Sequence, residues 1–129
     1  MTNLHYLVDM YGCAREKLAY VEDARKALNL AVERGRITKI GESYKQFEPY
    51  GASGVILVAE SHLSLHTWVD EGIVLADVFT CGSDVFPENA VRALIDYFEP
   101  ERTVVRKVYR GRDGEKVEEE IQEVLYEKG

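Results

Sequence analysis

Cysteine, clustered basic residues and long apolar runs are all scarce in this sequence. Of 129 residues only two are cysteine, Cys13 and Cys81, which is too few for the disulfide framework of a small secreted protein. No apolar run approaches the roughly 20 residues that a membrane helix needs, and the N-terminal residues lack the basic and then apolar order of a secretory signal. We therefore expect a cytoplasmic protein that has no membrane partner.

The charge balance is acidic. The sequence has 16 lysines and arginines and 23 aspartates and glutamates, which gives a formal net charge of −7. A nucleic-acid partner would require a clustered basic face, so we expect none. The length fits one domain that spans residues 1–129, with a core large enough to be stable by itself.

Hydrophobic periodicity predicts alternating strands and helices. Strands are predicted at residues 4–11, 37–47, 55–59, 62–66, 73–80 and 103–109, and helices at residues 18–34 and 87–98. The run at 55–59 is continuously apolar, which favours a strand covered on both faces. The spacing of Val117, Ile121, Val124 and Leu125 predicts a further, C-terminal amphipathic helix. The expected fold class is α+β, a two-layer sandwich of an antiparallel-dominated sheet with helices packed on one face.

The segment ESHLSLHTW, residues 60–68, holds most of the candidate chemistry. Its alternation places His62, Ser64 and His66 on the polar face of a strand. His62 and His66 would lie about 13 Å apart along an extended strand, too far to share one ion, and there is no Cys-x-x-Cys pair, so we expect no metal. Phosphate-loop, dinucleotide and nucleophile-elbow motifs are also absent. Hydrogen-bonded structure remains the alternative interpretation of these polar residues.

A family resemblance rests on FEPYGASGVILVAESHLSLHTW and the later DVFTCG, with the strand ending in YGC at the start of the chain. Together these segments resemble the prokaryotic S-adenosylmethionine decarboxylase proenzymes, a self-processing, pyruvoyl-dependent family. The likeness is strongest over residues 47–82, whereas the C-terminal third matches mainly in pattern. It implies a carboxy-lyase that supplies decarboxylated S-adenosylmethionine for spermidine and polyamine biosynthesis.

The resemblance implies that the chain cuts itself. Ser61 would attack the carbonyl carbon of Glu60, and cleavage between these residues would give fragments 1–60 and 61–129. Ser61 would become a pyruvoyl group at the new chain end. Decarboxylation of an amino acid leaves a carbanion that needs an electron sink, which no standard side chain provides and which a pyruvoyl ketone provides by forming a Schiff base.

Three further residues carry roles by the same resemblance. Ser53 would support processing, His66 would accept the α-proton during elimination, and Cys81 would donate the proton that completes decarboxylation. An imidazole and a thiol are suitable proton carriers near neutral pH. The structural alternatives are a turn residue for Ser53 and a buried apolar residue for Cys81.

Substrate binding is implied for Phe47, which would stack on adenine, and for Asp70, which would hold the ribose hydroxyls. The family commonly has Trp-Pro-Glu where this chain has Trp68-Val69-Asp70, and the aspartate is shorter by about 1.5 Å. Two alternatives therefore stay open. One is a pyruvoyl-dependent arginine decarboxylase on the same scaffold, and the other is an unprocessed, non-enzymatic ligand-binding or regulatory paralogue.

Strand geometry divides the candidate residues into two groups. A hairpin turn at residues 70–72 would place Ser61 opposite Thr80 or Cys81. His66 would lie about 16 Å from Ser61 along the same strand, so it would not reach that serine unless the strand bends sharply, and a second copy could supply it. The family resemblance also implies sites formed between protomers. We therefore expect a homodimer in which Ser61 and Cys81 of one chain meet Phe47, Ser53, His66 and Asp70 of the other.

Overall fold

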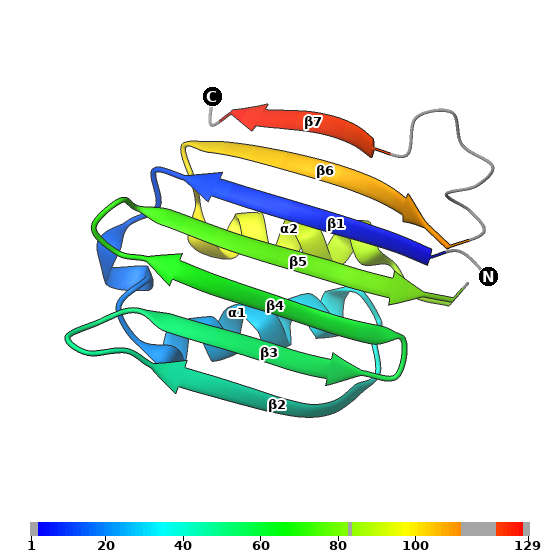
Figure 1. Cartoon of the computed structure of the whole chain (residues 1–129), viewed down its shortest axis with the longest axis horizontal. Coiled ribbons are helices and arrows are strands. Elements are labelled where there is room, and N and C mark those ends of the chain that lie inside the picture. Colours follow the sequence, from blue (N-terminus) through cyan, green and yellow to red (C-terminus); the bar gives the residue numbers. More distant parts are fainter. Residues whose placement is uncertain (1–2, 83, 112–120, 128–129) are drawn as a thin grey trace.

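A sheet forms one layer of the molecule and helices form the other (Figure 1). The computed structural model describes residues 3–82, 84–111 and 121–127. Within them the strands are β1 (Asn3–Tyr11), β2 (Lys39–Gln46), β3 (Ala52–Val58), β4 (Ser61–Trp68), β5 (Ile73–Cys81), β6 (Arg102–Arg110) and β7 (Ile121–Glu127). The helices are α1 (Val21–Arg34), α2 (Pro87–Phe98) and a 3-10 turn at Arg15–Lys17. The strand order is β2-β3-β4-β5-β1-β6-β7.

Every pairing between these strands is antiparallel, and α1 and α2 pack side by side on the same face of the sheet (Figure 1). Helix α1 covers β2, β3 and β4, whereas α2 covers β5 and β1. This confirms the predicted α+β sandwich. No helix in the described ranges is both long enough and apolar enough to cross a membrane.

The start of α1 is tied to the β2–β3 connection. The apolar spacing predicts a helix from residue 18, but α1 begins at Val21, and its N-cap Tyr20 provides no side-chain cap. Instead the Val21 amide donates to Gln46 Oε1 at 2.8 Å, which satisfies one of the free amides of the first helical turn. Gln46 Nε2 also donates to the carbonyls of Ala19 and Gly51. One glutamine therefore fixes the loop that begins at residue 47.

The prediction that both faces of the 55–59 strand are covered is wrong within the single chain. Strand β3 runs from Ala52 to Val58, with Ile56 and Val58 buried against the helices. Val55 and Leu57 point the other way and are 39% and 54% exposed. The reason is the two-layer architecture, because both helices lie on one face and no described helix covers the other.

The predicted C-terminal helix is also wrong. Ile121–Glu127 forms β7 and pairs antiparallel with β6, from Arg102 opposite Glu127 to Val108 opposite Ile121. Val117 lies outside the described residues. Strand β6 would otherwise present an edge of unpaired backbone groups, and the ladder to β7 satisfies them. This tertiary gain outweighs the weak helical spacing of a short segment.

Gly54 provides a test of the packing between layers. A Cβ at this position would lie 2.6 Å from the Tyr44 ring and 3.1 Å from a methyl group of Leu28. We expect Gly54→Ala to lower the free energy of unfolding by about 1–3 kcal/mol, measured by urea denaturation. Gly41→Ala in the paired strand is the matched control, because a Cβ there meets nothing within 4 Å. Equal stabilities of the two variants would contradict the described packing.

Candidate active site

The bond between Glu60 and Ser61 lies where a two-residue turn enters β4. Val58 pairs with Ser61, so Ala59 and Glu60 alone make the turn. Thr38 holds this turn from the side, because its carbonyl accepts from the Ala59 amide at 2.9 Å and its amide donates to the Glu60 carboxylate at 3.1 Å. The candidate cleavage point is therefore in an anchored turn and not in a loose loop.

Cys81 reaches this bond within the same chain. Its thiol donates to the Glu60 carbonyl oxygen at 3.3 Å. The β4–β5 register pairs His62 with Phe79, which brings Ser61 next to Thr80, as the hairpin geometry predicts. Cys81 is a free cysteine and is only partly buried. A donor on a carbonyl oxygen makes its carbon more susceptible to a nucleophile.

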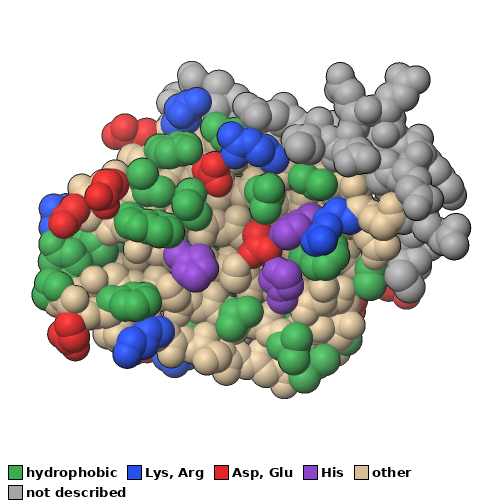
Figure 2. Space-filling view, in the orientation of Figure 1, with side chains coloured by type: hydrophobic (Ala, Val, Ile, Leu, Met, Phe, Trp, Pro, Cys, Tyr) green, Lys and Arg blue, Asp and Glu red, His purple; other side chains and the backbone are tan. Residues whose placement is uncertain are grey.

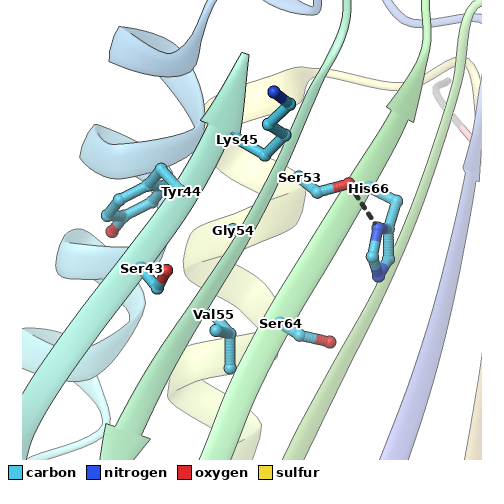
Figure 3. A pocket seen from close by; sticks show the side chains of 8 residues that line it. All are labelled: Ser43, Tyr44, Lys45, Ser53, Gly54, Val55, Ser64 and His66. Atoms are coloured by element: carbon cyan, nitrogen blue, oxygen red, sulfur yellow. Dashed lines mark hydrogen bonds between the residues drawn. The ribbon is translucent and has the colours of Figure 1, made fainter. Parts of the chain in front are cut away.

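Ser53 and His66 form a second group at the other end of β4. They face each other across β3 and β4, and Ser53 Oγ lies 2.6 Å from His66 Nδ1 (Figure 3). Both line a cavity of about 370 Å³ together with Phe47, Tyr50, Gly51, Thr67 and Trp68. When Nδ1–H donates to the serine, Nε2 of the same ring is left as a basic nitrogen. In that tautomer, the His66 ring can accept a proton at Nε2.

The aromatic rings of this cavity are accessible. Phe47 is 46% and Trp68 44% exposed, which suits stacking against a planar ligand. Asp70 lies beside the cavity, in the turn between β4 and β5. Its Oδ1 accepts from the Tyr50 hydroxyl at 2.7 Å and from Arg15 at 3.1 Å. The hydrogen bond to Asp70 raises the pKa of Tyr50.

Ser61 and His66 are not brought together in one chain. Five residues of a continuous strand separate them, which corresponds to about 16 Å. The described structure therefore has two separate groups, with Ser61 and Cys81 at one end of β4 and Phe47, Ser53, His66 and Asp70 at the other. Histidine and hydrophobic side chains are visible on the face of the sheet that no described helix covers (Figure 2).

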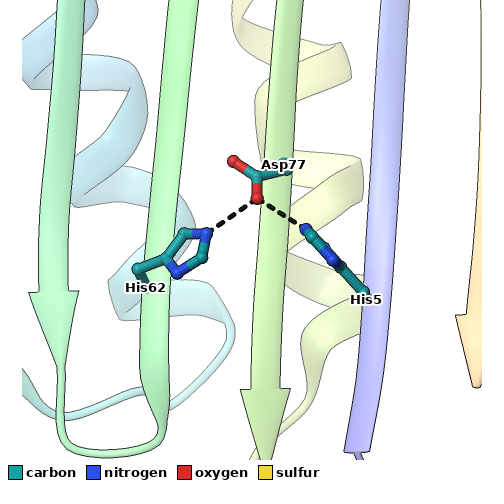
Figure 4. Close-up of side chains that lie close together, drawn as sticks. All are labelled: His5, His62 and Asp77. Carbon is teal, nitrogen blue, oxygen red and sulfur yellow. Dashed lines mark hydrogen bonds and ion pairs between the residues drawn. The ribbon is translucent and has the colours of Figure 1, made fainter. Parts of the chain in front are cut away.

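A third cluster, which the sequence analysis missed, joins three strands. Asp77 Oδ2 lies 2.6 Å from His5 Nε2 and 2.8 Å from His62 Nε2 (Figure 4). Ser64 donates to the other carboxylate oxygen. The signal available in the sequence was an aspartate within the otherwise apolar segment IVLADVF. On the two neighbouring strands, His5 and His62 both pair with Phe79, two residues after this aspartate. The pairing that places His5 beside β5 joins segments about 70 residues apart, which the local pattern does not encode.

Hydrogen bonds account for the protonation state of this cluster. Burial would raise the pKa of Asp77, but hydrogen bonds from His5, Ser64 and His62 outweigh it and lower the pKa to about 2. Arg110 donates to His5 Nδ1 at 3.3 Å, so His5 carries its proton on Nε2 and donates it to Asp77. The two imidazoles and the carboxylate could also reach one cation, because their ligand atoms lie within 4.8 Å of one another.

Comparisons with known proteins show the family of the chain. The family model described as S-adenosylmethionine decarboxylase matches residues 4–111. The S-adenosylmethionine decarboxylase proenzyme of Thermoplasma acidophilum is 44% identical over 108 residues, which cover 84% of this chain and 82% of that protein. The crystal structure of the adenosylmethionine decarboxylase from Aquifex aeolicus superposes with a TM-score of 0.81 at 41% identity, covering 85% of this chain and 91% of that one.

A more distant likeness concerns the fold alone. The crystal structure of the Trypanosoma brucei AdoMetDC-delta26 monomer gives a TM-score of 0.59 at 14% identity. It covers 81% of this chain but only 45% of the trypanosomal chain, so the sheet and helices described here correspond to about half of that larger protein.

The lowered pKa of Asp77 gives a prediction for stability. Its folded value of about 2 lies below the ordinary value of 3.8, so the contribution of the charge is complete above about pH 4 and is lost as the pH falls toward 2. Asp77→Asn should therefore lower the free energy of unfolding by about 2 kcal/mol at pH 7, and by progressively less below pH 4. Urea denaturation between pH 7 and pH 2.5 measures this difference.

Asp96→Asn is the control, because Asp96 takes part in an exposed ion pair with Arg34 at 3.7 Å. Such a pair contributes little, so this variant should stay within about 0.5 kcal/mol of the unmodified chain. A difference for Asp77→Asn that is the same at every pH would contradict the assigned charge state.

Proposed function

The chain belongs to the S-adenosylmethionine decarboxylase family, and from this premise we propose that it decarboxylates S-adenosylmethionine with a pyruvoyl group made from its own Ser61. The product would donate aminopropyl groups in polyamine synthesis. The activity follows from family membership. The observation that supports the self-processing mechanism in this chain is the Cys81 thiol on the Glu60 carbonyl oxygen. The comparisons favour neither arginine decarboxylation nor an unprocessed paralogue.

Processing begins at this carbonyl. Ser61 Oγ attacks the Glu60 carbonyl carbon, the bond to the Ser61 nitrogen breaks, and the amide becomes an ester. Cys81 stabilises the charge that develops on the carbonyl oxygen. Elimination then removes the α-proton of residue 61 and breaks its bond to the ester oxygen, which releases Glu60 as a carboxylate. One water enters, and the nitrogen leaves as ammonia.

His66 would accept the proton in the elimination. The contact with Ser53 fixes its ring, and protonation of Nδ1 leaves Nε2 free to act as the base. In the later decarboxylation the pyruvoyl group supplies the electron sink. Cys81, which lies at the same end of β4 as residue 61, is placed to return a proton to the substrate carbon.

The exposed cavity at the other end of β4 would bind the nucleoside. Phe47 would stack on the adenine ring, and Trp68 adds a second accessible aromatic surface. Asp70 would accept from the ribose hydroxyls. Its shorter side chain is held by Tyr50 and Arg15 through a single oxygen, Oδ1, which supports a role for Oδ2 in binding the ribose.

A homodimer would complete both halves of the site. A two-fold axis that crosses β4 between Ser61 and His66 would place the Ser61 end of one chain over the His66 end of the other. The apolar side chains of Val55 and Leu57, exposed on the face that the helices leave uncovered, support packing of this face against a second copy. The free thiols of Cys13 and Cys81 support a reducing, cytoplasmic setting.

Intact mass measures the cleavage directly. We expect two fragments that separate between Glu60 and Ser61, with a combined mass about 1 Da above that of the precursor, because water enters and ammonia leaves; simple hydrolysis would add about 18 Da. The cut protein should release labelled carbon dioxide from carboxyl-labelled S-adenosylmethionine. Ser61→Ala should remain a single, inactive chain. An unmodified chain that stays uncut, or is cut by hydrolysis alone, would overturn the mechanism.

Mixed dimers test the sharing of residues between chains. Differently tagged Ser61→Ala and His66→Ala chains are each expected to remain uncut when produced alone. When they are produced together, the His66→Ala chain should be cut, because its Ser61 faces an intact His66 of the partner. Ser53→Ala with His66→Ala is the matched control and should give no rescue, because both changes affect the same half-site. Absence of cleavage in the first mixture would rule out the shared arrangement.

A further inference from the structure

The cluster of His5, His62 and Asp77 lies next to the proposed cleavage point, because His62 directly follows Ser61. Asp77 is only 16% exposed in its side chain and connects β5 to both neighbouring strands, β4 through His62 and β1 through His5 (Figure 4). None of the roles in processing or decarboxylation uses these three side chains. One of them, His62, directly follows Ser61, and the other two hold His62 in place.

We propose that Asp77, supported by His5, is a positioning residue that holds His62 and so fixes the chain end created by cleavage. The proposal rests on the proposed self-processing at Ser61. In the cut enzyme, residue 61 is the first residue of its fragment, and His62 is the first with an intact side chain. The side chain of His62 is thus the intact side chain nearest to the new chain end through which the protein can hold that end.

Cleavage changes what holds residue 61. In the intact chain, the turn of Ala59 and Glu60 joins it to β3, and Thr38 anchors this turn. Once the bond to Glu60 is broken, this covalent support is lost, and the first residues of a strand fray unless other contacts hold them. The contact between His62 and Asp77 at 2.8 Å lies entirely within residues 61–129, so it persists after the cut.

The pairing of Phe79 shows how the cluster fixes His62 relative to β5. It pairs with His62 on one side and with His5 on the other, and its ring lies 5.7 Å and 4.8 Å from theirs. Both histidines then reach diagonally to Asp77, two residues back along β5. Cys81 lies two residues forward on the same strand. Fixing His62 against β5 therefore fixes residue 61 relative to the Cys81 thiol.

The hydrogen bonds make this support directional. Arg110 donates to His5, His5 donates to Asp77, and His62 and Ser64 also donate to Asp77. One carboxylate thus accepts hydrogen bonds from donors on β1 and β4, and Arg110 on β6 orients the His5 imidazole. Figure 4 shows the second nitrogen of the His62 ring on the side toward the turn between β3 and β4. A partly buried, charged acceptor with several donors favours one orientation of that ring.

Asp77→Asn tests the proposal, because it retains the shape and removes the charged acceptor. We expect cleavage at a rate within about twofold of the unmodified chain, because the anchored turn still presents Ser61, but a kcat lowered about tenfold or more with little change in KM. Hydrogen exchange in peptides covering residues 61–68 should be about tenfold faster in the cut variant than in the cut unmodified enzyme. In an uncut Ser61→Ala background, Asp77→Asn should speed exchange in residues 61–68 no more than in the peptide that covers β3, because only the general loss of stability remains.

His5 provides the second variant. His5→Ala removes a donor to Asp77 and should lower kcat about threefold, whereas His5→Gln, which keeps a donor at a similar position, should restore most of it. Asp96→Asn on α2 is the control and should stay within about twofold of the unmodified enzyme. A cut Asp77→Asn enzyme with unchanged kcat and exchange would overturn the proposal.

Loss of cleavage in both Asp77→Asn and His5→Ala, with folding retained by circular dichroism, would overturn it as well, because the cluster would then act in processing itself. These outcomes differ from a failure of the proposed function. In that case the unmodified chain itself would remain uncut and would release no carbon dioxide from S-adenosylmethionine.

Discussion

The pairing of β4 with β5 is the constraint on which the rest of the structure depends. Leu63 and Leu65 are fully buried beneath the helices, while His62, Ser64 and His66 lie on the opposite face. A slip of one residue would turn the polar side chains into the core and the leucines into solvent. Burying an uncompensated polar group costs about 1–3 kcal/mol, so several such groups hold the register firmly. The same register brings the Cys81 thiol to the Glu60 carbonyl.

The two-layer architecture explains why the site is open on one side. Both helices cover one face of the sheet, so the alternate side chains of the central strands have no partner layer among the described residues. This face carries the Ser53–His66 pair, the Asp77 cluster and exposed apolar side chains on β3. One face of the sheet thus packs against the helices, and the other presents the polar clusters, which the proposed dimer would cover.

The proposed cleavage would break the chain within a sheet, and the fold would tolerate such a break. The bond between Glu60 and Ser61 joins two neighbouring strands, and both strands keep their ladders when it is cut, because β3 remains paired with β2 and β4 with β5. Loss of a two-residue turn costs little when the hydrogen bonds on either side persist. After the proposed cleavage, the new chain end would be the least supported part, and the first residue of β4 would have to stay close to Cys81.

Local pattern was sufficient for the elements whose burial follows their own sequence. The alternation in β4 and the helical spacing in α2 predicted both elements, and the motif around Ser61 predicted the family, which the comparisons confirm. Pattern failed for the last segment, because the choice between a helix and a strand at Ile121–Glu127 depends on the open edge of β6. It failed for β3 because an apolar run does not reveal whether one face or both are covered.

By itself, then, the sequence determined the chemistry available, since a serine after a glutamate, a histidine five residues on and a cysteine in the next strand are local facts of order and spacing. Only the tertiary structure decided which of these groups meet. The contact of Cys81 with Glu60 requires the β4–β5 register, and the meeting of His5 with Asp77 requires β1 to enter between β5 and β6. Such contacts join segments that are distant along the chain, and the burial of the whole core, which no local window contains, selects them.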